Sequence, residues 1–131
     1  MLSALDLARR IEAGELTPAD VVDRCAEAIV AREAVIGAFV SLDIEGARAC
    51  AQNAGSLRGL PVGIKDIIDT ADFPTEYGSP IYAGHRPKAD AALVSLVRRA
   101  GGVVLGKTTN TELAYLHPGK TRNPRNPAHT P

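Results

Sequence analysis

The chain has 131 residues, 45% of them hydrophobic, which is enough to bury one core of ordinary domain size. Lysine plus arginine equal aspartate plus glutamate at 15 each, so no net charge is available to attract nucleic acid or an anionic membrane. Neither a secretory signal pattern nor an apolar run near the ~20 residues of a membrane-spanning helix is found, which predicts a cytoplasmic protein with no membrane partner.

Two helices are predicted at the beginning of the chain. In residues 3–13 the apolar residues recur at helical spacing, and Ser3 fits the N-cap position before them. Thr17, Pro18 and Asp20 match the N-cap, N1 and N3 positions of a second helix. The residues of this second helix that we expect to face a partner surface are Val22, Cys25, Ala26, Ile29 and Val30.

The pattern then changes from helical to extended. A short strand is expected over residues 38–42, followed by an Ala-rich helix over residues 43–53. Residues 60–69 form a nearly continuous apolar stretch around one lysine, which favours a strand buried on both faces. Residues 73–87 hold three prolines and two glycines, so they predict a loop, and its two tyrosines are expected to pack it down.

A helix and a strand follow this loop. Residues 90–100 restore a helical period, and Gly101 is expected to end the helix in a left-handed conformation. The apolar residues that carry this period are Leu93, Leu96 and Val97. A short strand is predicted over residues 103–105 and a further helix over residues 111–115, whereas the last 14 residues hold four prolines and no period.

These elements together predict an α/β fold. Leading helices would occupy residues 1–55, and residues 56–131 would begin a mixed, helix-covered β-sheet that is incomplete within this chain. We therefore expect residues 1–131 to be the amino-terminal portion of a single domain.

Residues 101–108 match the phosphate-loop pattern G-x-x-x-x-G-K-[ST] letter for letter. A phosphate loop needs its variable positions to turn after a strand, so that successive N–H groups converge on the phosphates. Here the variable positions are Gly-Val-Val-Leu, which favour a strand, and a helix precedes them. We expect no nucleotide to bind there, and no cofactor is predicted.

No metal site is predicted either. His85, His117 and His129 lie in expected loops without ligand spacing, which indicates surface histidines. Cys25 and Cys50 have no further cysteines with which to form a zinc site, and we expect them to be small buried residues in a reducing compartment.

Lys65 is the main candidate for chemistry, because it lies in the apolar stretch and burying an ammonium without compensation is costly. One hypothesis is structural: the lysine reaches out from a strand edge, or it pairs with Asp66 or Asp69. The other hypothesis is catalytic: desolvation lowers the pKa of the amine until it can accept a proton from a hydroxyl nucleophile. Local sequence leaves both open.

Residues 59–66, Gly-Leu-Pro-Val-Gly-Ile-Lys-Asp, are similar to the lysine motif of the amidase signature family. Further similarities follow in the family's order, at Gly78-Ser79, at Asp90-Ala91, at Gly106-Lys107-Thr108 with Glu112, and in the tail, residues 123–131. The resemblance covers residues 59–131. Residues 5–18 and 63–70 are most similar to malonamidase-type members of the family.

The resemblance implies an amidase that acts on linear carboxamides through a Ser-cisSer-Lys triad. The family's lysine deprotonates a bridging serine, which relays the proton from the nucleophilic serine, and an acyl-enzyme forms before water releases the acid. Lys65 takes the position of the base, and Ala114 and Tyr115 fall where family members line the acyl pocket. Both serines are expected in a Gly/Ser-rich stretch after Pro131, so the 131 residues alone are predicted to be inactive.

Two alternatives to the hydrolase remain open. The lysine motif is shared with the transamidase type of the family, the glutamyl-tRNA amidotransferases, in which a partner subunit could bind the RNA. The chain could instead be a non-catalytic, truncated interaction domain that uses its two leading helices as a partner surface. For the hydrolase, the expected partners are a small-molecule amide, the carboxyl-terminal part of the same enzyme and a second copy in a homodimer, with no direct contact to nucleic acid.

Overall fold

Four α-helices and a three-stranded sheet make up residues 2–131, the part of the chain that the computed structural model describes. The elements, in chain order, are α1 (Ala4–Glu12), α2 (Pro18–Ile36), β1 (Phe39–Leu42), α3 (Ile44–Cys50), β2 (Pro61–Lys65), α4 (Ala92–Arg99) and β3 (Val103–Thr108). Two 3₁₀ turns, Pro80–Tyr82 and Glu112–Ala114, lie in loops. None of the helices in residues 2–131 has the length and apolarity to cross a membrane.

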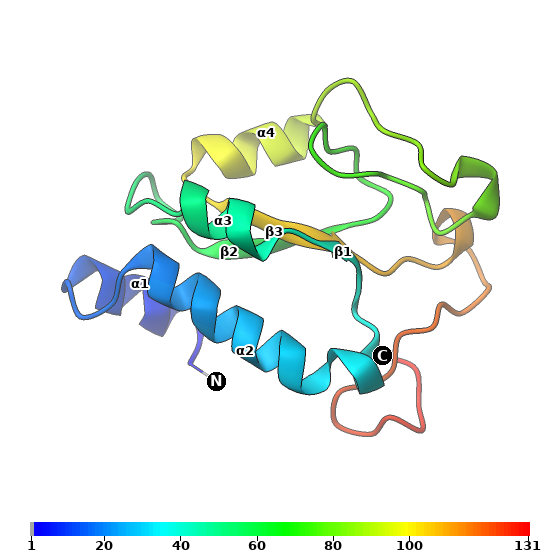
Figure 1. The fold of residues 1–131 in the computed structure, drawn as a ribbon, viewed down its shortest axis with the longest axis horizontal. Coiled ribbons are helices and arrows are strands. Elements are labelled where there is room, and N and C mark those ends of the chain that lie inside the picture. Colours follow the sequence, from blue (N-terminus) through cyan, green and yellow to red (C-terminus); the bar gives the residue numbers. More distant parts are fainter. Residues whose placement is uncertain (1) are drawn as a thin grey trace.

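The sheet is mixed, with strand order β1-β3-β2 (Figure 1). The central strand, β3, pairs antiparallel with β1 and parallel with β2. Helices α2 and α3 pack on one face of the sheet and α4 packs on the other. The predicted α/β class with a mixed, helix-covered sheet is confirmed.

Alternate residues of β3 enter two apolar clusters, one on each face of the sheet, because successive side chains of a strand point in opposite directions. The cluster beneath α2 and α3 consists of Val22, Ala47, Val103 and Leu105. The cluster beneath α4 consists of Ile64, Phe73, Val94 and Val104. The first five residues of β3 are all buried, so this strand is covered on both faces.

Burial of β2 on both faces was also expected, and for this strand the expectation is wrong. Of its five residues only Ile64 is buried, and Gly63 and Lys65 are exposed. Within residues 2–131 β2 pairs with β3 alone, so it is an edge strand, and a cavity separates the face that carries Gly63 from α2.

Both leading helices begin where the sequence predicts. Ser3 caps α1 and Thr17 caps α2, and each forms a reciprocal capping box with the aspartate three residues later. Val22 of α2 is fully buried, but Val30, which we expected on the same face, is 83% exposed. Eight residues at 3.6 per turn place Val30 about 80° around the helix from Val22, which takes it off the buried stripe.

Two smaller expectations fail, one at Cys50 and one at residues 111–115. Cys25 is half-buried, but Cys50 is exposed at the end of the short helix α3. In α4 the buried residue is Val94, whereas Leu93 and Leu96 are 52% and 55% exposed. The helix expected at residues 111–115 is only a 3₁₀ turn, because Leu113 adopts a φ of +50° inside it.

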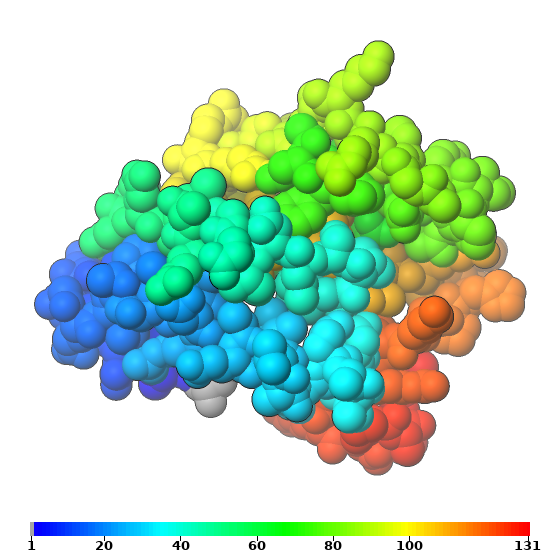
Figure 2. Space-filling model, viewed as in Figure 1, coloured from blue at the N-terminus to red at the C-terminus, as the bar shows by residue number. Residues whose placement is uncertain are grey.

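The last part of the chain packs beside the carboxyl end of α2 (Figure 2). The guanidinium of Arg32 donates to the carbonyl of Pro124 at 2.7 Å, and the backbone N–H of Arg122 donates to the carbonyl of Ile36 at 2.8 Å. These contacts bring the end of the chain to the same side of the sheet as α2.

Replacing Gly101 with alanine is expected to destabilise the fold by about 3 kcal/mol. Gly101 ends α4 with φ +82°, as predicted, and a Cβ there would overlap the carbonyl of Ala54. Gly14 is the matched control, because its φ is +73° but a Cβ would meet nothing within 4 Å. Gly14→Ala should cost only about 1 kcal/mol, so equal losses in urea unfolding would contradict this expectation.

Candidate active site

Lys65 is the last residue of β2, and its side chain lies on the outward face of that strand. Its neighbours Ile64 and Asp66 are 4% and 1% exposed, so side chains alternate across the strand as geometry requires. Neither predicted carboxylate pairs with the lysine, because Asp66 faces a different lysine and Asp69 accepts a hydrogen bond from Tyr77. The expectation that Lys65 is buried is therefore wrong for residues 2–131.

A cavity of about 380 Å³ lies in front of the Lys65 side chain. Its polar lining includes Thr109, Asn110, Thr111, Thr121 and Thr130. Pro131, the last residue of the chain, also lines the cavity. Lys65 and Pro131 therefore line one cavity, together with four threonines and an asparagine.

The buried lysine of this region is Lys107, for which the sequence predicts no catalytic role: it lies in the rejected phosphate-loop match and in one of the segments that resemble the family. Lys107 lies in β3 and is 0% exposed. Its amine donates to the carbonyl of Ile68 at 2.6 Å and to the hydroxyls of Thr75 and Thr70 at 2.6 and 3.2 Å. The carboxylate of Asp66 lies 3.9 Å away. The three N–H donors of the ammonium thus each have an acceptor within the protein.

Asp66 connects Lys107 to the loop that follows β2. Its carboxylate oxygens accept the backbone N–H groups of Glu76 and Gly78 at 3.2 and 3.3 Å. Burial lowers the pKa of the Lys107 amine, and the negative charge of Asp66 opposes that shift. The pair and its hydrogen bonds form a closed polar network beneath the end of β2.

Tyr77 also stabilises this loop. Its hydroxyl donates to the carboxylate of Asp69 at 2.7 Å, and this bond raises the pKa of Tyr77 to about 12. The ring of Tyr82 packs edge-on against Tyr77 with centroids 4.9 Å apart. The prediction that the two tyrosines pack the loop is confirmed.

Asn110 is a candidate that the sequence did not reveal. Its side chain is 6% exposed and lines the cavity that contains Lys65. The amide nitrogen donates weakly to the carbonyl of Tyr77 at 3.5 Å, and the buried Oδ1 finds no donor among residues 2–131. An unpaired buried carbonyl costs about 1–3 kcal/mol, so this oxygen is suited to accept a hydrogen bond from a ligand or a further segment. No local pattern distinguishes it from an ordinary loop asparagine.

Ala114 and Tyr115 lie outside the Lys65 cavity. Both are exposed, and Tyr115, at 77% exposure, lines a neighbouring hollow with Leu113 and Leu116. Leu116 also lines the Lys65 cavity, so the two spaces adjoin. The structure places the predicted acyl-pocket residues next to Lys65 without bringing them into the same cavity.

The histidines add no further chemistry to this site. His85, His117 and His129 are exposed in loops. In the described part of the chain, no group of three or more His, Cys, Asp or Glu side chains is arranged to hold a metal ion.

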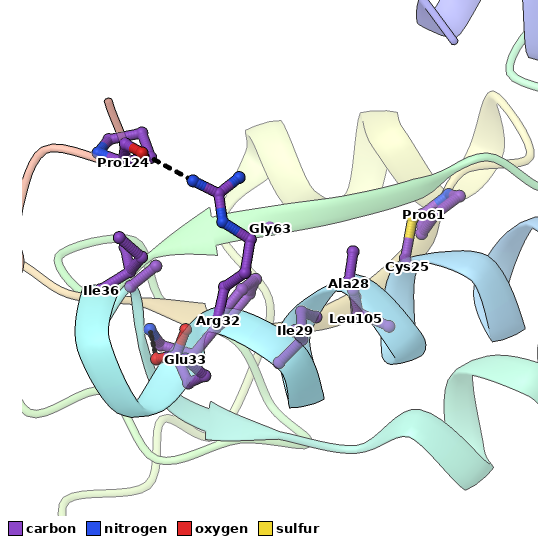
Figure 3. A pocket seen from close by; sticks show the side chains of 12 residues that line it. Cys25, Ala28, Ile29, Arg32, Glu33, Ile36, Pro61, Gly63, Leu105 and Pro124 are labelled. Carbon is purple, nitrogen blue, oxygen red and sulfur yellow. Dashed lines mark hydrogen bonds between the residues drawn. The ribbon is translucent and has the colours of Figure 1, made fainter. Parts of the chain in front are cut away.

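A second cavity, of about 390 Å³, lies between α2 and the outward face of β2 (Figure 3). Its lining is largely apolar, and its two charged side chains are already engaged. Arg32 donates to the Pro124 carbonyl, and the Glu33 carboxylate accepts the backbone N–H of Phe39 at 2.7 Å. Without a free acid, base or nucleophile, this cavity is a weaker candidate than the one at Lys65.

Magnesium ATP is expected to leave the melting temperature of the chain unchanged. Residues 103–108 form a buried strand and the Lys107 amine is enclosed, so neither can cradle a phosphate. A real ligand at a hundred times its Kd would stabilise the fold by about 2.7 kcal/mol. A clear rise in melting temperature that Lys107→Ala abolishes would overturn this expectation.

Comparison with known proteins adds independent information. The family model described as Amidase matches residues 20–131. The A-subunit of glutamyl-tRNA(Gln) amidotransferase from Salinispora arenicola is 38% identical over 94% of this chain and 28% of its own length. An amidase of Pseudomonas putida is 36% identical over 99% of this chain and 30% of its own length. The structure of the native peptide amidase from Stenotrophomonas maltophilia matches with a TM-score of 0.78 and 31% identity, over 92% of this chain and 27% of that one. The chain thus spans under a third of the length of these relatives.

Proposed function

Because the chain belongs to the amidase family, we propose that it supplies the general base, Lys65, of an enzyme that hydrolyses linear carboxamides. The nucleophilic serine and the bridging serine would lie on polypeptide that follows Pro131. The proposal covers the whole enzyme, of which residues 1–131 would form the amino-terminal part.

The observation that carries the proposal is the shared cavity of Lys65 and Pro131. A segment that continues from Pro131 would begin at the cavity that Lys65 lines. This amine is exposed, and it has no carboxylate partner among the described residues, so it is available to a hydroxyl arriving from that segment. A base must lie within hydrogen-bond reach of the proton that it accepts, and this arrangement allows that.

The residues would take the following roles in the reaction. The neutral Lys65 amine would accept the proton of the bridging serine, which in turn takes the proton of the nucleophilic serine as that oxygen attacks the amide carbonyl. The proton would return along the same path to the leaving nitrogen, and ammonia or an amine would depart. Closure of the cavity by the added segment would remove Lys65 from water, and removal from water disfavours the charged form of an amine.

A transamidase is the second candidate, and the 38% identity to the amidotransferase from Salinispora arenicola is the observation that favours it. The identities to this amidotransferase and to the amidase differ by only two percentage points, 38% against 36%, so they do not separate the two activities. A hydrolase would pass the acyl group to water, whereas a transamidase would use the ammonia that it releases to amidate a misacylated transfer RNA.

The test uses the full-length enzyme and follows the released ammonia. Malonamate is the first substrate to assay, because residues 5–18 and 63–70 resemble malonamidase-type members. Release of free ammonia and acid from malonamate or another short amide, without RNA, supports the hydrolase. Turnover of glutamine that requires misacylated transfer RNA together with a partner protein supports the transamidase. If a folded, full-length preparation shows neither of these two activities, the proposal is refuted.

A further inference from the structure

We propose that Lys107 is a positioning residue for Lys65: it holds Asp66 and the loop over residues 66–79 in place, so that the Lys65 amine keeps its direction into the cavity. This inference rests on the proposed role of Lys65 as the base. Lys107 itself is enclosed and is not among the residues that line the cavity.

Lys107 binds three points of one loop. Its amine lies 2.6 Å from the Ile68 carbonyl, 3.2 Å from the Thr70 hydroxyl and 2.6 Å from the Thr75 hydroxyl. These acceptors span residues 68–75, and Lys107 comes from β3, which is distant in sequence. A single ammonium therefore ties the loop after β2 to the centre of the sheet.

Asp66 extends this tie to the remainder of the loop. Its carboxylate lies 3.9 Å from the Lys107 amine and accepts the N–H groups of Glu76 and Gly78. Asp66 is 1% exposed, so its negative charge requires a buried partner, and within residues 2–131 Lys107 is the lysine or arginine that pairs with it. Loss of Lys107 would leave that carboxylate uncompensated.

The same network reaches the backbone of Lys65. The N–H of Asp66 donates to the Thr108 carbonyl at 2.9 Å, and the N–H of Ile68 donates to the Lys65 carbonyl at 3.0 Å. These two N–H groups fix the peptide groups around Lys65. Lys107 contacts the same two residues, through the carboxylate of Asp66 and the carbonyl of Ile68. Release of Lys107 would free the turn that starts at Lys65, and a base displaced by about 1 Å can lose about 100-fold in rate.

A buried cation could also serve stability alone, so the variants must separate the two roles. Lys107→Met removes the amine but leaves the Asp66 carboxylate unpaired, which destabilises the fold. The double variant Lys107→Met with Asp66→Asn removes both charges, so no uncompensated carboxylate remains buried. Thr75→Val is the mild variant, because it keeps the shape and both charges while it removes one acceptor of the Lys107 amine.

Steady-state kinetics and urea unfolding of the full-length enzyme test the proposal. We expect the double variant to regain stability relative to Lys107→Met, while its kcat stays about 100-fold below that of the parent and its KM changes less than about threefold. Thr75→Val should unfold at a somewhat lower urea concentration than the parent, because one donor of a buried ammonium loses its acceptor, and it should lose about tenfold in kcat. Lys88→Met, an exposed lysine in a loop, is the matched control and should retain full activity.

Two results would overturn the proposal. One is a double variant that regains stability and whose kcat also returns to the parent value. The other is an unchanged kcat in Thr75→Val, which decides the matter even if the double variant does not fold. A Lys65→Met enzyme with full activity would instead refute the proposed function, so the two failures are distinguishable.

Discussion

Lys65→Met is expected to lower kcat/KM for amide hydrolysis by at least about a thousandfold in the full-length enzyme. Methionine preserves the unbranched apolar stem and removes only the amine that would accept the serine proton. Lys65 has no ion-pair partner among residues 2–131, and removing an amine that the full-length enzyme would hold out of water should not lower the free energy of unfolding. The expected signature is therefore a large kinetic loss without a loss of stability.

The measurement is steady-state release of ammonia together with urea unfolding, on the parent, Lys65→Met and the control Lys88→Met. Lys88 is also an exposed lysine, but it lies in the loop before α4, and its variant should behave as the parent. A Lys65→Met enzyme that keeps more than a tenth of the parent kcat/KM would remove the base assignment, because a positioned base contributes about a hundredfold or more.

The second large effect concerns residues 1–131 on their own, which we expect to hydrolyse no amide. The proposed mechanism needs a serine nucleophile from the segment that follows Pro131, and a base without a nucleophile cannot form an acyl-enzyme. Mixing the chain with the polypeptide that continues from Pro131 should produce activity. β2 offers an open edge within residues 2–131, and the Lys65 cavity offers a polar surface, so both are available to the added polypeptide.

The matched control is the 131-residue chain carrying Lys65→Met, mixed with the same polypeptide. It should bind equally well and remain inactive, which shows that activity on mixing needs the amine and not only the assembly. Turnover of malonamate by the unmixed 131-residue chain would contradict the prediction and would indicate a nucleophile among these residues.

Local signals in the sequence predict the helix ends well. Ser3 and Thr17 start their helices because capping depends on a residue and its neighbour three positions later, both visible in the sequence. Gly101 ends α4 with a positive φ for an equally local reason. The segment that matches the phosphate-loop pattern contains the strand β3, as the apolar residues before Gly106 indicate.

The burial of the two lysines could not be predicted in the same way. Lys65 and Lys107 both lie at the ends of apolar strands, and apolar neighbours say that a strand is buried without saying which face is covered. That depends on the parallel pairing, which sets Lys65 opposite Thr108 and Ile64 opposite Lys107. A buried ammonium needs hydrogen-bond or charge partners, and this requirement applies to Lys107 as much as to Lys65. Once β3 is known to be the central strand, the requirement predicts a polar network around Lys107.

The cavity at Lys65 was even less accessible to sequence reasoning, because its walls come from segments far apart in the chain. Thr109 and Asn110 follow β3, whereas Thr130 and Pro131 arrive through the contacts of the last segment with α2. In the sequence, only a family resemblance places Lys65 near the segment after Pro131. The geometry supplies a separate argument for the same placement.

The rate of acyl-enzyme formation tests the central claim most directly, since Lys65 is assigned to the activation of a serine. Full-length parent and Lys65→Met enzymes would be mixed with an amide substrate, quenched in acid at successive times and analysed by intact mass. The parent should gain the mass of the acyl group on a serine that lies after Pro131, and Lys65→Met should form this adduct at least about a thousandfold more slowly. An adduct that forms at the parent rate in Lys65→Met would contradict the role of Lys65 as the base.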